Sequence, residues 1–205
     1  APDASGDPVL AALARDITAA KLKSIVYLSS LGVYGDHDGA WIDEAAPTIP
    51  AHTRGASRVD AELAWQALGR EHNTPTAILR LGGIYGPGQN AFVRLLAGRA
   101  HRIDKPGHVS NRIHVADIAQ AIDAAFARGY DGVVNVVDNE PVPPSDQIEF
   151  AAKLLGIAPP PRLSLDEARR TLSPFLMSFY EGCARVRNDR LKRELGVTLR
   201  YPNYR

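Results

Sequence analysis

The sequence has little that points to disulfides, membranes or nucleic acids. Its 205 residues include a single cysteine, Cys183, in an apolar neighbourhood, so no disulfide framework is predicted. No apolar run approaches the ~20 residues that a membrane-spanning helix needs, and the first eight residues lack a basic region followed by an apolar stretch. The net charge is only +1, and charges of both signs are scattered along the chain. These features predict a cytoplasmic protein with no nucleic-acid partner and no membrane partner.

The sequence also lacks the residue spacing of a metal site. His37, Asp43 and Glu44 lie in a turn-rich stretch, residues 36–52, that reads as surface loop. Their spacing follows no recognised ligand pattern, and carboxylates in such loops are usually solvated. No metal site is therefore predicted.

A short strand and the hydroxyl groups after it are the most informative part of the sequence. Residues 25–28 form a β-branched and aromatic run, which is typical of a strand buried in a parallel sheet. Ser29, Ser30, Gly32 and Tyr34 follow it. Because ligands of open α/β sheets bind at the carboxyl ends of the strands, these residues are candidates for contact with a ligand. The alternative is that the serines satisfy loop backbone groups and that Tyr34 packs under a turn.

Other segments show the spacing of regular structure. Residues 8–20 have an Asp-Pro start and apolar residues along one helical face, which predicts a helix. A second helix is predicted from Arg54, with Gly69 as its C-cap. We further predict strands at 76–81 and 132–137, a helix at 115–126, a helix capped by Ser145 and closed by Gly156, and a capping box at Ser164.

Two motifs resemble those of one superfamily. Ser29-Ser-x-x-Val-Tyr-Gly35 and Arg112-Ile-His-Val-x-Asp-Ile-Ala119 are similar to motifs of the extended short-chain dehydrogenases/reductases, the NAD-dependent epimerases and dehydratases that act on nucleotide sugars and related substrates. The resemblance implies an α/β fold with a Rossmann-like parallel sheet and flanking helices. Residues 1–138 would be the remaining part of an NAD(P)-binding domain, with a substrate-side insert at about 89–115. Residues 139–205 would form a small, mainly helical substrate lobe.

The dinucleotide-binding strands of that superfamily are absent from these residues. Their glycine-rich turn admits the dinucleotide pyrophosphate to a helix N-terminus. The glycines of residues 82–88 also follow a strand, but Pro87 interrupts the run into a helix, so this loop is expected on the substrate side. We therefore expect the chain to be the C-terminal part of a longer protein, in which Pro2 lies in the loop after the fourth strand.

The resemblance also implies catalytic roles. Ser30 corresponds to the serine that hydrogen-bonds the reacting oxygen, and Tyr34 is the substitute acid or base that the sequence offers. In the superfamily, a glutamate lies four residues after the lysine of a Tyr-x-x-x-Lys pair. When Glu62 is aligned with that glutamate, the tyrosine and the lysine correspond to Arg54 and Arg58. Arginine is effectively always protonated, so Arg54 cannot take a proton as the tyrosine does. The two arginines are one turn apart and are candidates to bind an anionic substrate group, or they are simply exposed helix residues.

The strand at 76–81 and the glycine loop after it resemble the segment that flanks the nicotinamide and the substrate. Gly83 stands where the superfamily often has an asparagine that contacts the substrate diphosphate, so a nucleotide sugar would lose an anchor. Tyr85 and Arg112 are candidate substrate-binding residues, and Arg112 is also expected to pair with Asp117. The residues expected at the cofactor, NAD or NADP, are Pro2, Ser29, Arg58, Leu81, Gly82 and Gly83.

Two functions remain open from the sequence. The first is an NAD(P)-dependent oxidoreductase, epimerase or dehydratase that acts on a sugar-nucleotide-like or other small hydroxyl or carbonyl substrate. The second is a non-catalytic NAD(P)-binding protein with a regulatory or redox-sensing role. Retention of Ser30 favours the first, and the pair Arg54 and Arg58 favours the second. An aromatic-rich patch at 175–180 would close the substrate pocket, form a homodimer surface, or pack in the core.

Overall fold

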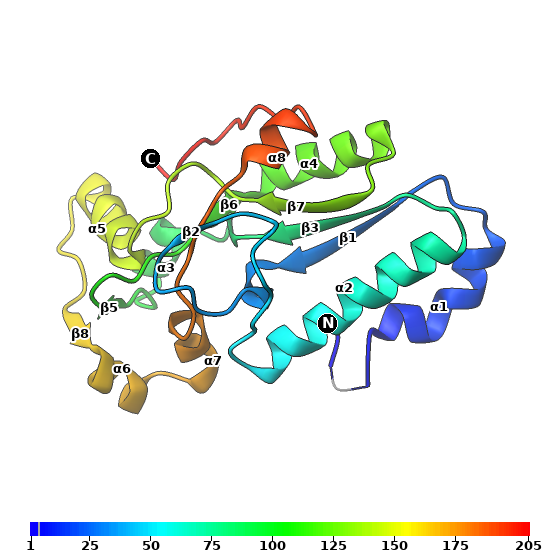
Figure 1. Ribbon diagram of the computed structural model, residues 1–205. Helices are drawn as coiled ribbons and strands as arrows, with labels where there is room; N and C mark the ends of the chain where they lie inside the picture. The colour runs from blue at the N-terminus through cyan, green and yellow to red at the C-terminus, as the bar shows by residue number, and fades with distance from the viewer. Residues whose placement is uncertain (4) are drawn as a thin grey trace.

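The computed structural model describes residues 1–3 and 5–205, and a three-stranded parallel sheet with helices on both faces organises them (Figure 1). The strands pair in the order β1-β3-β7. They are β1 (Ile25–Ser30), β3 (Thr76–Leu81) and β7 (Gly132–Val136). One face packs against α1 (Pro8–Ala19) and α2 (Thr53–Glu71), and the other against α4 (Val115–Arg128) and α8 (Asp189–Arg193). The predicted α/β class, with a parallel sheet and flanking helices, is confirmed.

Smaller elements gather beyond the carboxyl ends of these strands. The short strands form three parallel pairs, β2 with β9, β4 with β6, and β5 with β8. They are β2 (Trp41–Ile42), β4 (Gly83–Tyr85), β5 (Arg102–Asp104), β6 (Arg112–His114), β8 (Arg162–Ser164) and β9 (Arg185–Val186). The helices here are α3 (Ala91–Leu96), α5 (Pro144–Leu155), α6 (Leu165–Thr171) and α7 (Pro174–Met177), with 3-10 turns η1 (Leu31–Val33) and η2 (Ser178–Tyr180).

Side-chain alternation in the strands builds a core on each face of the sheet. All of β3 is buried. Leu79 packs in the cluster under α4 and α8, whereas its neighbour Ile78 packs with Ile25 and Trp65 under α1 and α2. Because successive side chains of a strand point to opposite faces, the parity of a residue decides which layer it joins. The same rule separates Ser29 from Ser30 at the end of β1.

Helix ends confirm some sequence predictions and correct others. Asp7 caps α1 by accepting from the Val9 amide at 2.9 Å, and Ser164 forms the predicted capping box at the start of α6. Gly69 does not end α2, which continues to Glu71. A Cβ at Gly69 would lie 2.1 Å from Thr76 Oγ1, so this glycine allows α2 to approach β3 closely. Ser145 is also not a cap, because α5 begins at Pro144 with no side-chain cap bond.

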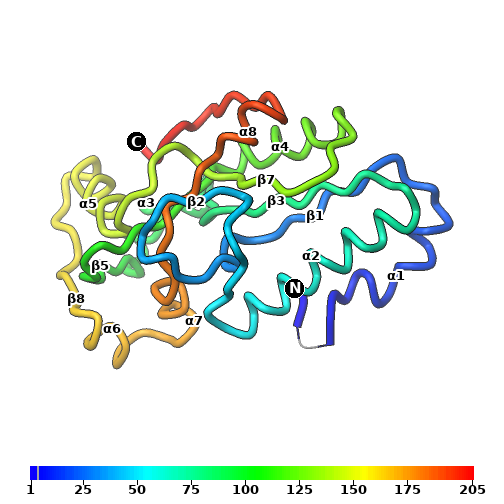
Figure 2. Tube along the Cα trace, in the orientation of Figure 1, coloured from blue at the N-terminus to red at the C-terminus, as the bar shows by residue number. Residues whose placement is uncertain are grey.

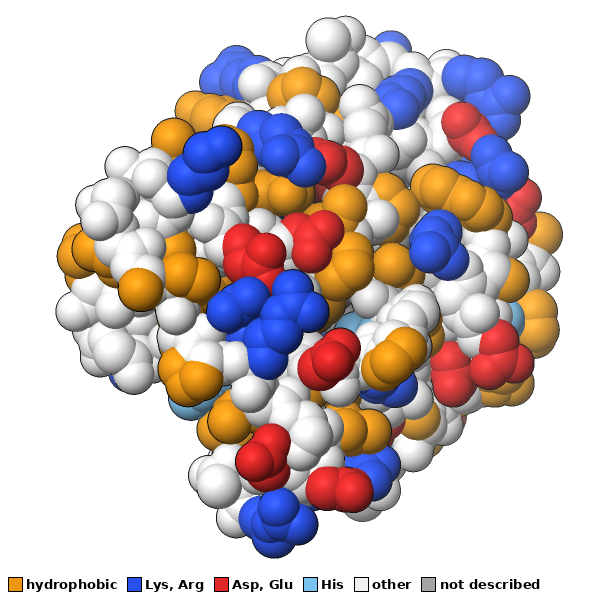
Figure 3. Space-filling model, turned by 90° about the vertical axis from the view of Figure 1, so that its left-hand side faces the viewer, with side chains coloured by type: hydrophobic (Ala, Val, Ile, Leu, Met, Phe, Trp, Pro, Cys, Tyr) orange, Lys and Arg blue, Asp and Glu red, His pale blue; other side chains and the backbone are white. Residues whose placement is uncertain are grey.

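The last part of the chain returns to the central sheet. Leu191 and Leu195 are fully buried in the same cluster as Leu79, and Figure 2 shows the C-terminal segment running back beside α4. The predicted lobe at 139–205 stays a prediction, but its final residues contribute to the core. On the face shown in Figure 3, basic and acidic side chains are interspersed. Within the described residues, no helix has the length and apolar character needed to cross a membrane.

Candidate functional site

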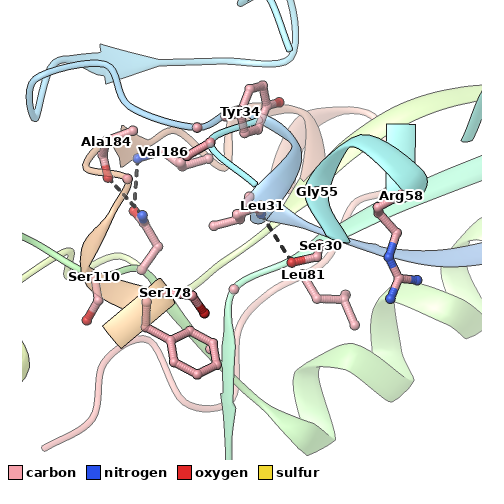
Figure 4. A pocket seen from close by; sticks show the side chains of 18 of the residues that line it. Ser30, Leu31, Tyr34, Gly55, Arg58, Leu81, Ser110, Ser178, Ala184 and Val186 are labelled. Atoms are coloured by element: carbon pink, nitrogen blue, oxygen red, sulfur yellow. Dashed lines mark hydrogen bonds between the residues drawn. The ribbon is translucent and has the colours of Figure 1, made fainter. Parts of the chain in front are cut away.

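A cleft of about 430 Å³ opens at the carboxyl ends of β1 and β3 (Figure 4). Its walls come from the β1–η1 junction, the start of α2, the loop after β3 and the chain between η2 and β9. The lining includes Ser30, Leu31, His52, Arg54, Arg58, Leu81, Gly82, Gly83, Ser110, Phe179 and Val186. Ligands of parallel α/β sheets bind at this edge, so we treat the cleft as the candidate active site.

Ser30 lies in the wall of this cleft with its hydroxyl available. It is half-buried, its backbone is extended, and its Oγ accepts a hydrogen bond from the Gly32 amide at 3.1 Å (Figure 4). A hydroxyl has one donor besides its acceptor lone pairs, so the Ser30 O–H can still donate. The position agrees with the role expected for Ser30, which stays a prediction.

Ser29 does not face the cleft, which corrects its assignment to the cofactor. Strand alternation directs it to the α2 side of the sheet, where it is 5% exposed and donates to Glu62 Oε1. Arg80 donates to the same carboxylate at 2.7 Å. Ser29, Glu62 and Arg80 therefore form a buried network, in which the Ser29 hydroxyl has a structural partner.

Tyr34 lies in the wall of the cleft, but its hydroxyl has a structural partner, which disfavours the predicted role as an acid or base. Its side chain is 1% exposed, and its hydroxyl donates to Asn135 Oδ1 at 2.8 Å. The guanidinium of Arg80 lies 4.7 Å from the centre of its ring. Burial raises the pKa of the Tyr34 phenol. Figure 4 shows the ring directed away from the middle of the cleft, which matches the packing alternative left open by the sequence.

The two arginines at the start of α2 diverge. Arg58 Nη1 donates to the Tyr27 hydroxyl and to a main-chain carbonyl of β1, each at 3.1 Å. Arg54 is exposed, donates to Ser178 Oγ at 3.1 Å, and lies 4.8 Å from the centre of the Phe175 ring. Arg58 is thus held beside β1, whereas Arg54 joins α2 to the α7–η2 segment. This divergence contradicts the expectation that both bind one anionic group.

His52 is a cleft residue that the sequence reasoning missed. It is the N-cap of α2, where its Nδ1 accepts from the Gly55 amide at 3.1 Å. A neutral imidazole that accepts at Nδ1 carries its proton on Nε2. Histidine is not among the residues favoured at N-caps. The only sequence signal was therefore its place just before Arg54, at the end of a loop.

A second cleft of about 420 Å³ adjoins the first, and Tyr85 and Arg112 line it. Tyr85 presents its ring, because its hydroxyl donates to the Asn203 carbonyl at 2.9 Å. Arg112 is 6% exposed and donates to the Ser110 carbonyl at 3.3 Å. The expected ion pair with Asp117 is wrong, since that carboxylate accepts from the main-chain amides of residues 200 and 201.

The remaining predicted cofactor residues divide into two groups. Leu81, Gly82 and Gly83 line the first cleft, at the end of β3. Pro2 is buried and lines neither cleft, so its role stays a prediction.

Comparison with known proteins places this geometry in a family. The NAD dependent epimerase/dehydratase family matches residues 7–137. A 3-diazoavenalumate denitrifying reductase of Streptomyces is 30% identical over 172 residues, which cover 80% of this chain and 57% of the reductase. The chain thus spans little more than half the length of that curated relative.

Solved structures share the same architecture. A functionally unknown protein of Silicibacter pomeroyi is 53% identical, with a TM-score of 0.92 over 100% of this chain and 72% of its own. The dTDP-glucose 4,6-dehydratase of Bacillus anthracis, solved in complex with NAD, is 20% identical, with a TM-score of 0.74 over 93% of this chain and 61% of its own. By the extent of the family match and the site geometry together, the chain belongs to the NAD-dependent epimerase/dehydratase family.

Proposed function

We propose that this chain carries the substrate side of an NAD(P)-dependent oxidoreductase that reduces a carbonyl group, or oxidises the corresponding alcohol. The observation that carries the proposal is the convergence of Ser30, Arg58 and the glycines 82–83 on one cleft at the carboxyl edge of the parallel sheet. The relative named as a reductase supports reduction rather than epimerisation.

The residues at this edge fit NAD or NADP. Gly82 is buried, and an added Cβ would lie 3.1 Å from the backbone of residue 112, so this glycine allows the loop to pack against β6. Gly83 is exposed, and its bare backbone would permit the close approach that a flat nicotinamide ring requires. The hydrogen bonds of Arg58 use Nη1, so Nη2 and Nε remain as donors for ribose hydroxyls. When bound, the cofactor would supply or accept a hydride.

The chain's own residues would manage the oxygen and its proton. The Ser30 hydroxyl would donate a hydrogen bond to the substrate oxygen and stabilise the charge that develops there during reduction. The His52 Nε2–H would donate a second hydrogen bond to the same oxygen. The alkoxide that forms when the carbonyl gains a hydride would take its proton from water in the cleft and become an alcohol. In this proposal the imidazole keeps its own proton and acts as a hydrogen-bond donor.

Cofactor binding tests the proposal at Arg58. In the full-length protein, we expect one of NADH and NADPH to bind tightly in a fluorescence titration. Replacing Arg58 with alanine should weaken this binding about tenfold, because a hydrogen bond from a charged donor contributes ~1.5–3 kcal/mol. Arg70→Ala is the matched control, since Arg70 is exposed near the other end of the same helix. If neither cofactor bound at millimolar concentration, the proposal would be overturned.

Turnover tests His52 separately. The variant His52→Asn keeps an oxygen that can cap α2 but removes the imidazole. We expect kcat to fall about 10²-fold, as for loss of a hydrogen-bond donor to the developing oxyanion, while the melting temperature and the cofactor affinity stay unchanged. Steady-state kinetics and thermal unfolding measure the two effects. A variant with the kcat of the parent protein would remove His52 from the mechanism.

A non-catalytic NAD(P)-binding role is the second candidate, and the position of Arg54 favours it. The guanidinium that replaces the superfamily's tyrosine is held by Ser178 and Phe175, so no acid or base stands at that place. The two functions differ in turnover. Tight cofactor binding without reduction of any carbonyl substrate would support the second.

A further inference from the structure

The second cleft has an unusual charge pattern. Its wall contains three arginines and a histidine, Arg94, Arg99, Arg112 and His101, and no Asp or Glu of the described residues lines it. The cleft adjoins the first one, and Gly83 and Ser110 line both. This adjacency would let a molecule held in the second cleft extend toward Ser30 and the glycine loop in the first.

Arg112 is the buried cation of this cleft. Its side chain is 6% exposed. Within the described part of the chain, no carboxylate oxygen lies within 4.0 Å of its guanidinium nitrogens, the limit for a salt bridge. Asp138 is its close neighbour, with its amide donating to the Arg112 carbonyl at 2.6 Å. Burial raises the pKa of Asp138 to about 7, which makes that carboxyl a weak counterion. A buried charge without a full counterion is costly, so a ligand anion would stabilise this site.

Arg94 adds a second donor at the rim. It is exposed on α3, and its Nη2 donates to Gln147 Oε1 at 3.3 Å, which holds the side chain over the cleft. A guanidinium offers five N–H donors, so this single bond leaves most of them for a ligand. Two arginines from different elements therefore converge on one space.

The rest of the wall combines apolar side chains with the amides of Gln89, Asn90, Asn111 and Gln147. Ile84, Ile148, Leu176 and Tyr180 contribute side chains from four different segments. The volume of about 420 Å³ lies at the lower end of the ~300–1,000 Å³ that ligand pockets span. An apolar patch beside a cationic corner suits a small organic acid with an apolar body.

We infer that the substrate is a small aryl carboxylate, with its carboxylate held by Arg112 and Arg94 and its ring against Ile148 and Tyr180. The inference rests on the proposed function, because the far end of the same molecule would carry the carbonyl that meets Ser30. Arginine forks match carboxylates geometrically, and this pairing would set the orientation of the substrate.

Calorimetric titration of the full-length protein, with and without its cofactor, tests the inference. The probes are benzoate, phenylacetate and trans-cinnamate, with cinnamamide as the neutral match and UDP-glucose as the competitor. We expect at least one carboxylate to bind, cinnamamide not to bind, and UDP-glucose not to displace the acid. Arg112→Gln and Arg94→Gln should each weaken the binding about tenfold or more. Arg15→Gln, on exposed α1, should leave it unchanged.

The outcomes separate this inference from the proposed function. Binding of the amide as tight as that of the acid, displacement by UDP-glucose, or no carboxylate binding at millimolar concentration would overturn the substrate class, whatever the cofactor does. Loss of cofactor binding alone would overturn the proposed function. Because Arg112 is buried, the melting temperature of its variant is measured as well. If that variant does not fold, the test rests on the exposed Arg94. Unchanged carboxylate binding in Arg94→Gln would then overturn the inference.

Discussion

Replacing Ser30 with alanine is expected to lower kcat about 10²–10³-fold, the effect of removing one donor from an oxyanion-type site. Ser30 lines the candidate active site. Its Oγ accepts a hydrogen bond from the Gly32 amide, and this bond leaves the O–H able to donate to a substrate. Its loss removes an interaction that strengthens as negative charge builds on the substrate oxygen. The measurement is steady-state kinetics of carbonyl reduction in the full-length protein, with cofactor affinity measured in parallel.

The adjacent serine is the matched control for this experiment. Ser29 is the same residue type in the same strand, but it donates to Glu62 on the opposite face of the sheet. Ser29→Ala should therefore lower the free energy of unfolding by ~1.5–3 kcal/mol, as for a lost hydrogen bond to a charged group, with little change in kcat. Equal losses of kcat in the two variants would contradict the assignment of Ser30.

The second large effect is on stability and comes from Glu62. Glu62 is 3% exposed and Arg80 is 6% exposed, and the two side chains form a bidentate pair. The variant Glu62→Gln keeps the shape but leaves the Arg80 charge without its counterion. Breaking a buried pair in this way costs about 3–5 kcal/mol. Urea unfolding monitored by circular dichroism measures the change in the free energy of unfolding.

Two further variants test the reason for this effect. Asp166→Asn breaks an exposed pair with Arg169, at 3.3 Å, and should change stability by less than ~0.5 kcal/mol. Glu62→Leu combined with Arg80→Met removes both charges and should recover much of the loss, since a buried pair is often replaceable by apolar residues. A loss in Glu62→Gln as small as in Asp166→Asn would show that Arg80 finds another partner.

Much of the fold could be predicted because it depends on local spacing. The apolar runs at 25–28 and 76–81 became central strands, and the Asp-Pro start of α1 and the capping box at Ser164 formed as expected. Gly69 shows the limit of this reasoning. Its sequence context resembles a helix C-cap, but in the structure it allows α2 to pack closely against Thr76. No local sequence pattern reveals this contact.

The candidate site was predicted in part, and the errors share a cause. Ser30, Arg58 and the glycines 82–83 line the cleft as expected, because the carboxyl ends of parallel strands meet at one edge. From their position in a motif, Ser29 was expected at the cofactor and Tyr34 was expected to act as an acid or base. Their hydroxyls have structural partners instead.

The sequence by itself determined the parallel sheet, the helices beside it and the edge at which a ligand would bind, because periodicity and capping act over a few residues. Only the tertiary structure decided which polar groups are free. Ser29 meets Glu62 across 33 residues, and Tyr34 meets Asn135 across 101. Such pairings depend on the register of distant strands and on the face that each residue occupies. The same distant packing brought Arg94 and Arg112 together in one cleft and left their charges open to a ligand.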